Sequence, residues 1–170
     1  MEPTDADQGG KMQMKVDQNL RSILMVDDDR DDQKLVEKAL REKGTQNPLL
    51  FLSDGEELLD YLKRRGKFSD PKNPRRPCFI LLDLNMPRMD GRKALLFLKA
   101  DPELKKIPVV VLSTSGAEED ILRSYNLGAN SFIVKPNDYQ GLLAMAESLI
   151  KYWLELVELP PNNGKTPPHE

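Results

Sequence analysis

Five polar side chains follow short apolar runs of the sequence, and their types suit phosphoryl chemistry. They are Asp27, Asp28, Asp83, Ser113 and Lys135. Three carboxylates that lie close together repel one another unless a cation joins them, and a single lysine does not neutralise them. Mg²⁺, for which Mn²⁺ can substitute, is the expected occupant because it prefers oxygen ligands. With the metal bound, one carboxylate can attack a phosphoryl group and form an acyl phosphate.

The elements that must position these side chains follow from an alternation of apolar runs with helical patterns. The runs cover residues 23–26, 49–52, 79–82, 109–112 and 132–134. Runs that are apolar throughout are typical of parallel strands covered on both faces. We therefore predict an α/β fold, a doubly wound five-stranded parallel sheet with strand order 2-1-3-4-5 and the flavodoxin-like (βα)5 topology. Ligands of such sheets bind outside the carboxyl ends of the strands, where the five polar side chains are expected.

Several helix ends carry capping signals. Ser53 with Glu56, and Ser115 with Glu118, fit the capping box of a helix N-terminus. Gly128 is expected to end a helix in the left-handed conformation. A further acidic group, Asp29, Asp31 and Asp32, is interpreted as the start of a helix, where negative charge complements the helix dipole.

Composition limits the function classes. The net charge of −3 and the pI near 5.4 argue against a general nucleic-acid or anionic-membrane binder. The single cysteine, Cys78, allows no internal disulfide and is interpreted as a core residue. No signal-peptide core or membrane-length apolar run is present in the sequence, so we expect a cytoplasmic protein with no membrane partner. A flexible leader over residues 1–20, one domain over 21–158 and a flexible tail over 159–170 are predicted.

Four motifs resemble those of one known family, the CheY-like receiver domain of two-component response regulators. They are VDDD at 26–29, LLDLNMPRMDG at 81–91, PVVVLSTS at 108–115 and SFIVKP at 131–136. The resemblance runs from about residue 22 to 157 and identifies 21–158 as a receiver domain. It implies that a sensor histidine kinase phosphorylates Asp83. It also implies that Asp28, Asp83 and the backbone carbonyl of Asn85 ligate the metal, with Asp27 holding a coordinated water.

The same resemblance assigns roles beside the acidic residues. Ser113 would hydrogen-bond a phosphoryl oxygen and Lys135 would pair with it, and the peptide bond between Lys135 and Pro136 would be cis. Phe132 stands where the family keeps an aromatic switch residue. The chain would not be an enzyme acting on a separate substrate, but a phosphoacceptor that promotes its own phosphoryl transfer and dephosphorylation. Asn85 replaces the general acid that a haloacid dehalogenase-type phosphatase would need two residues after its nucleophile.

The output of such a receiver is left open. The chain is similar to the single-domain regulators that partner phytochrome-type histidine kinases. Alternatives are a phosphorelay intermediate that passes its phosphoryl group to an Hpt protein, and an interaction module that works without phosphorylation. No DNA-binding domain is expected, because only 13 residues follow Val157. The basic segment over 63–77 is either a solvated loop or a docking patch for an acidic partner.

A homodimer is predicted from the final helix, expected over residues 137–157. Its apolar residues continue beyond what one sheet can cover, and a two-fold copy of the same surface is the commonest partner. The residues concerned are Tyr152, Trp153, Leu154, Leu156 and Val157.

Overall fold

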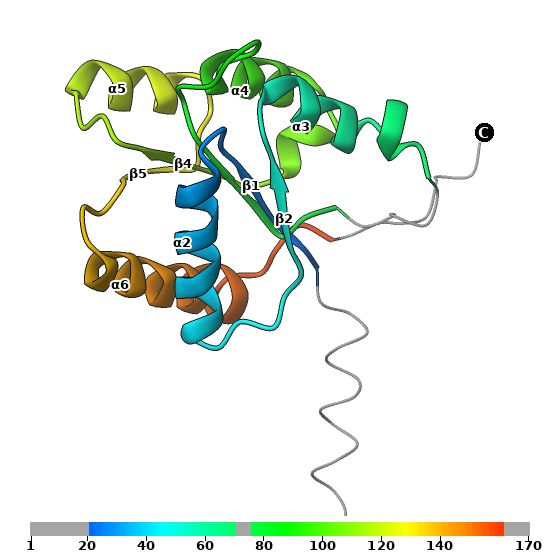
Figure 1. The fold of residues 1–170 in the computed structure, drawn as a ribbon. Helices are drawn as coiled ribbons and strands as arrows, with labels where there is room; N and C mark the ends of the chain where they lie inside the picture. The colour runs from blue at the N-terminus through cyan, green and yellow to red at the C-terminus, as the bar shows by residue number, and fades with distance from the viewer. Residues whose placement is uncertain (1–20, 71–75, 162–170) are drawn as a thin grey trace, which may run out of the picture.

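The computed structural model describes residues 21–70 and 76–161. The predicted leader, most of the predicted C-terminal tail and residues 71–75 of the basic segment lie outside the described residues. Five strands form one parallel sheet in the order β2-β1-β3-β4-β5, which confirms the predicted topology (Figure 1). The strands are β1 (Ile23–Val26), β2 (Leu49–Leu52), β3 (Phe79–Leu82), β4 (Val109–Ser113) and β5 (Ser131–Val134).

Helices cover both faces of this sheet. Figure 1 shows α3, α4 and α5 on one face and α2 and α6 on the other. The helices are α2 (Arg30–Glu42), α3 (Gly55–Leu62), α4 (Gly91–Ala100), α5 (Glu118–Asn126) and α6 (Tyr139–Leu149), with short 3-10 turns η1 (Gly66–Phe68) and η2 (Leu104–Lys106). In the part of the chain that the structure describes, no helix is long and apolar enough to cross a membrane.

The hydrophobic core divides between the two faces because successive strand residues point in opposite directions. Leu24 and Val26 of β1 belong to the cluster under α3 and α4, whereas Ile23 and Met25 belong to the cluster under α2 and α6. Every residue of β1, β3 and β4 is buried, and the edge strands β2 and β5 are mostly half-buried. Full burial of each such side chain stabilises the fold by roughly 1.5–3 kcal/mol. The polar residues that follow the central strands are thus carried by strands whose residues are all buried.

The predicted helix caps need correction. Helix α3 is capped by Asp54, whose carboxylate accepts a hydrogen bond from the amide of Glu57 (2.9 Å), so the box lies one residue later than the predicted Ser53 and Glu56. Helix α5 begins after Ala117 without a side-chain cap. The hydroxyl of Ser115 instead donates to the carboxylate of Asp120 (2.7 Å). Gly128, with φ of +102°, follows the end of α5 as predicted.

The final helix also differs from the predicted one. It starts at Tyr139 after the cap Asp138, and from Ile150 to Leu156 it continues as the π-helical segment η3. The ring of Trp153 stacks on Phe79 with centroids 5.9 Å apart.

Contacts with the domain continue past its predicted boundary at residue 158. Leu159 packs against the core cluster under α2 and α6. The guanidinium of Arg21 donates to the carbonyls of Pro160 (2.9 Å) and Pro77 (2.8 Å), so it ties the two ends of the domain to the start of β3. Residues 159 and 160, in the predicted tail, thus contact the folded domain.

Candidate acidic pocket at the carboxyl edge of the sheet

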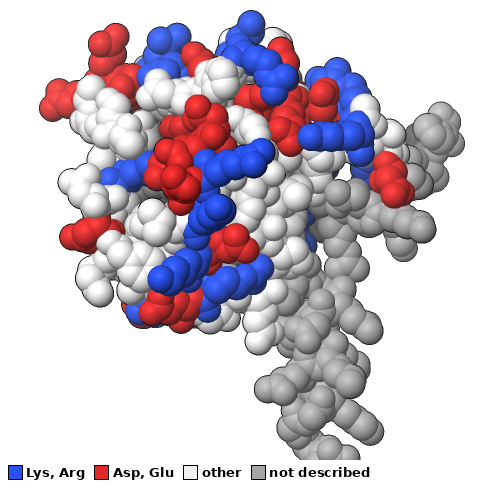
Figure 2. Space-filling view, viewed as in Figure 1, with Lys and Arg blue, Asp and Glu red and all other residues white. Residues whose placement is uncertain are grey.

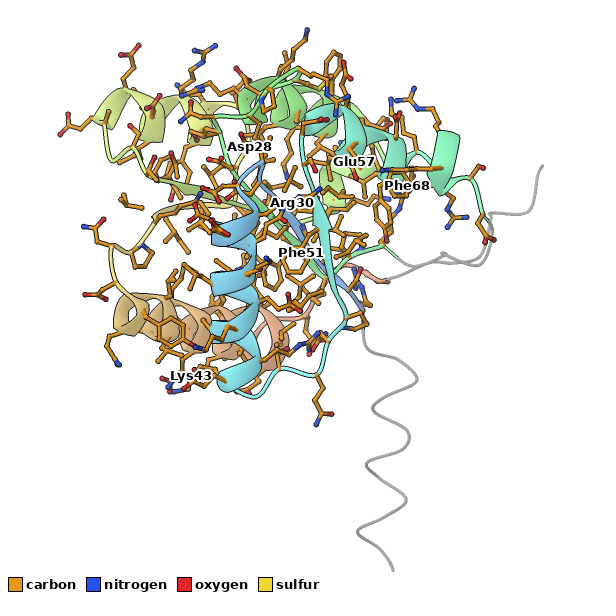
Figure 3. The ribbon with its side chains drawn as sticks, in the orientation of Figure 1. Asp28, Arg30, Lys43, Phe51, Glu57 and Phe68 are labelled. Atoms are coloured by element: carbon orange, nitrogen blue, oxygen red, sulfur yellow. The ribbon has the colours of Figure 1, made fainter. Side chains whose placement is uncertain are left out.

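Three carboxylates meet at the carboxyl ends of neighbouring strands. Asp27 and Asp28 follow β1 and Asp83 follows β3, and these strands pair in register with Val26 opposite Leu82. One carboxylate oxygen from each acid lies within 4.8 Å of the other two. Asp28 lies exposed in the loop before α2 (Figure 3), whereas Asp27 and Asp83 are buried. The predicted acidic cluster is thus brought together, and its oxygen donors fit a hard divalent cation.

Burial raises the pKa of Asp83 to about 6. The positive charge of Lys135 opposes this rise, and the negative charges of Asp27 and Asp28 add to it. The amide of Asn85 lies 3.4 Å from the Asp83 carboxylate. A carboxylate in this position is held in a costly charged state, which a bound cation would relieve.

The Asp27 side chain is fixed by several partners. One carboxylate oxygen accepts from the amide of Asp29 (2.9 Å) and the other from the ammonium of Lys135 (2.8 Å). The side-chain amide of Gln33 donates to the Asp27 carbonyl (2.6 Å) and to the Leu52 carbonyl (3.2 Å). This ties α2 to the ends of β1 and β2. Gln33 was missed by sequence reasoning because an amide inside a helix carries no distinctive signal.

Lys135 follows β5 and reaches into the pocket as predicted, where it pairs with two carboxylates. Its ammonium bonds to Asp27 and also to Asp32 in the first turn of α2 (3.0 Å). Burial by itself would lower the pKa of Lys135, but these hydrogen bonds and the nearby negative charge hold that pKa above its ordinary value. Asp29 caps α2 as interpreted from the sequence. Asp32, interpreted only as a helix-start residue, is a second partner of the lysine.

The peptide bond between Lys135 and Pro136 is trans, since the described residues contain no cis peptide bond. The predicted cis bond is therefore wrong. The trans form is favoured by about 0.5–1 kcal/mol before proline. Lys135 reaches both of its carboxylate partners from this trans backbone.

Ser113 is fully buried at the end of β4, next to the strand that carries Asp83. Its hydroxyl oxygen accepts from the amide of Ser115 (3.2 Å), and its carbonyl accepts from the amide of Lys135 (2.7 Å). Beyond it, Asp120 of α5 joins the hydroxyl of Ser115 to Arg92 of α4 (2.8 Å). The loop after β4 is thereby linked to two helices.

Phe132, the predicted switch residue, lies in β5 beside β4 and is half-buried. Its ring packs against the core cluster under α3 and α4. Its amide donates to the hydroxyl of Tyr125 in α5 (3.2 Å). The ring is therefore part of the surface between α5 and β5.

Charges outside the pocket are mixed. Figure 2 shows Lys and Arg side chains interspersed with Asp and Glu over the face drawn there. In the described part of the basic segment, Arg65 pairs with Asp60 (3.2 Å) and Lys67 with Glu57 (3.2 Å). These pairs favour the solvated-loop interpretation of that part.

Comparison with known proteins gives one family. The model of the response regulator receiver domain matches residues 23–147. Response regulator Rcp1 from Synechocystis sp. is 40% identical over 138 residues, which make up 81% of this chain and 92% of Rcp1.

Solved structures agree with this result. The Mn²⁺-bound form of Rcp1 has a TM-score of 0.75 at 39% identity, over 83% of this chain and 99% of that chain. The phosphorylated cyanobacterial phytochrome response regulator RcpA has a TM-score of 0.77 at 39% identity, over 84% of this chain and 99% of that chain. The chain belongs to the response regulator receiver family of two-component signalling proteins.

Proposed function

We propose that this receiver accepts a phosphoryl group on Asp83 from a sensor histidine kinase. The observation that carries the proposal is the meeting of three carboxylates within 4.8 Å beside Lys135. A carboxylate oxygen of Asp83 forms the new bond to phosphorus. The bond from phosphorus to the donor nitrogen breaks, and the histidine ring keeps the electron pair. Asp83 is the acceptor because it is the acid at the central strand β3, next to the strand that ends in Ser113.

Asp28, Asp83 and the carbonyl of Asn85 would hold Mg²⁺ or Mn²⁺, with Asp27 acting through a coordinated water. The Mn²⁺ in the Rcp1 structure supports this assignment. When bound, the ion offsets the negative charge of the carboxylates and of the phosphoryl oxygens. The same pocket would promote the later loss of the phosphoryl group to water, so the chain changes its own state and has no separate substrate.

Ser113 and Lys135 would bind the phosphoryl oxygens after transfer. The Ser113 hydroxyl oxygen accepts from the amide of Ser115, so its proton is available, and the hydroxyl gains a charge-assisted hydrogen bond by moving toward the phosphoryl group. This movement frees space next to β5, into which the Phe132 ring can turn. The signal would thereby reach the surface of α5, β5 and α6.

The test is phosphorylation by acetyl phosphate in the presence of Mg²⁺, followed by intact-protein mass spectrometry. Wild-type protein is expected to gain one phosphoryl group and Asp83→Asn none, with circular dichroism showing that the variant is folded. Equal uptake by the two proteins would contradict the assignment.

Ser113→Ala is expected to accept the phosphoryl group but to lose its effect on partner affinity.

A phytochrome-type histidine kinase is the proposed partner. The name of RcpA, a phytochrome response regulator, and its 39% identity to this chain support the proposal. Phosphotransfer from each histidine kinase of the source organism to the purified protein would test it. Rapid transfer from a light-sensing kinase is expected, and exclusive transfer from kinases of another class would contradict it. Onward transfer to an Hpt protein in the same assay would indicate a relay.

Homodimerisation through α6 and η3 is the proposed output. Tyr152 and Leu156 are 49% and 73% exposed, and a hollow of about 460 Å³ lies between β5 and these helices. It is lined mainly by apolar residues, among them Ile133, Leu149 and Trp153. An exposed apolar surface of this kind favours a partner of the same composition.

Sedimentation velocity at increasing protein concentration tests the dimer, with and without phosphorylation. Leu156→Glu is expected to shift the protein toward monomer. Leu96→Glu is the matched control, since Leu96 lies on α4 and is 54% exposed. A wild-type protein that stays monomeric in both states would exclude this output.

A further inference from the structure

The ammonium of Lys135 is divided between two carboxylates, neither of which is Asp83. Its hydrogen bonds go to Asp27 (2.8 Å) and Asp32 (3.0 Å). In the part of the chain described by the structure, no hydrogen bond joins Lys135 to Asp83, and the two interact only through their charges. The two hydrogen bonds take up two of the three N–H groups of the ammonium and direct it toward Asp27 and Asp32, so a phosphoryl group on Asp83 has to draw the lysine against them.

The two partners differ in how easily they can release the lysine. The Asp27 side chain is 1% exposed, so without Lys135 it would be a buried charge with no ionic partner. The Asp32 side chain is 37% exposed. It borders a hollow of about 180 Å³, lined also by Lys135 and Pro136, through which water can reach its carboxylate. Asp32 is therefore the partner that water can replace.

We infer that Asp32 is a positioning residue that competes with the phosphoryl group on Asp83 for Lys135. The inference rests on the proposed phosphorylation of Asp83. Before transfer, Asp32 holds the lysine toward α2. As the new bond to phosphorus forms, negative charge grows on the phosphoryl oxygens, and the ammonium exchanges Asp32 for one of them while it keeps Asp27. The bond between Lys135 and Asp32 thus lowers the rate at which Asp83 is phosphorylated.

The decisive variant is Asp32→Asn, and Asp31→Asn is its matched control. Asp31 is the preceding residue, is exposed, and, like Asp32, donates its backbone amide to the cap Asp29. Either substitution removes one negative charge from the first turn of α2, so both have the same effect on the helix dipole and a similar effect on the local potential. Only Asp32→Asn removes a bond to Lys135.

The measurement is the initial rate of phosphorylation by acetyl phosphate at saturating Mg²⁺, with the Mg²⁺ affinity of each variant determined first. Asp32→Asn is expected to react about two- to fivefold faster than Asp31→Asn, the range that corresponds to one partly exposed ion pair. In a Lys135→Met background the ratio of the two rates is expected to fall to about one, because the competition needs the lysine. A structural role of Asp32 in α2 alone would not produce this dependence on Lys135. Asp32→Ser provides a second variant with the same expectation.

Rates of Asp32→Asn and Asp32→Ser equal to or below that of Asp31→Asn would overturn the inference. So would a rate ratio that stays unchanged in the Lys135→Met background. If wild-type protein takes up no phosphoryl group at all, the proposed function is refuted. The inferred competition, which depends on that function, is then refuted as well. The two failures are therefore told apart by the wild-type measurement.

Discussion

Asp83 is a carboxylate that the fold holds in an unfavourable place. It is 8% exposed and faces two other acids. Burial raises its pKa to about 6, which means that its charged form is more costly in the folded protein than in the unfolded chain. The same arrangement favours binding of a cation, because the cation offsets the cost of the buried carboxylate charges. With the cation bound, a phosphoryl group on Asp83 is stabilised as well.

Asp83→Asn is therefore expected to stabilise the metal-free protein at pH 7 to 8. A raised pKa of an acid makes the folded state bind more protons, so its destabilising effect grows as pH rises from about 4 and is complete above about 6. The difference in unfolding free energy between Asp83→Asn and wild type should shrink as the pH is lowered from 7 to 5. Urea unfolding in EDTA at several pH values measures it. A variant less stable than wild type at pH 7.5 would contradict this account.

The acids of the pocket were predictable because each directly follows an apolar strand, and the strand order brings those ends together. Asp32 was not predictable in the same way. Its contact with Lys135 depends on the rotation of α2 about its axis and on the path of β5 into the loop that follows it. Both are set by packing, which leaves no local pattern in the sequence.

The turn between β3 and α4 holds the backbone of Asp83 in place. The amide of Gly91, the first residue of α4, donates to the carbonyl of Leu84 (2.9 Å), and Asp90 caps the helix through the amide of Lys93 (3.0 Å). A Cβ atom at Gly91 would lie 2.1 Å from the backbone oxygen of Asp83. Helix α4 can start this close to the acceptor only with a glycine at that position.

Gly91→Ala should destabilise the domain by about 1–3 kcal/mol or more, since backbone must shift to admit the methyl group. Phosphorylation should slow at the same time, because the atoms that move belong to Asp83. Gly116→Ala is the control, since its Cβ would lie 3.4 Å from the nearest atom, a Val134 methyl group. Guanidinium unfolding and the acetyl phosphate assay measure both effects. Equal stability of the two variants would refute the close-approach argument.

The type and order of the helices and strands could be predicted, but their ends were less certain. Ser53 and Asp54 are both good caps, and only the backbone geometry selects Asp54. The change from α- to π-helix at Ile150 is invisible to a search for helical periodicity, because apolar residues continue through both segments.

At the scale of the whole molecule, three carboxylates that repel one another are grouped at the carboxyl ends of a well-packed sheet. Mg²⁺ should therefore raise the melting temperature. At about 100 times its Kd a ligand stabilises the folded state by about 2.7 kcal/mol, which corresponds to a rise of roughly 5–10 °C for a domain of this size. Differential scanning calorimetry should show the rise in wild type and lose most of it in Asp28→Ala. An undiminished rise in Asp28→Ala would place the metal elsewhere, and Asp31→Asn controls for the lost charge.

The stacking of Trp153 on Phe79 determines what can be seen by fluorescence. Phe79 begins β3 and Asp83 follows its end, about 13 Å along the strand, so the only tryptophan of the sequence packs near the amino end of β3 and away from the acceptor. Its emission should shift to the red on unfolding but stay nearly constant when Mg²⁺ binds. Because Trp153 lines the hollow proposed for the dimer, the emission should instead change with protein concentration. This intrinsic signal would report assembly and unfolding while remaining insensitive to the pocket, so occupancy of the pocket needs an independent probe.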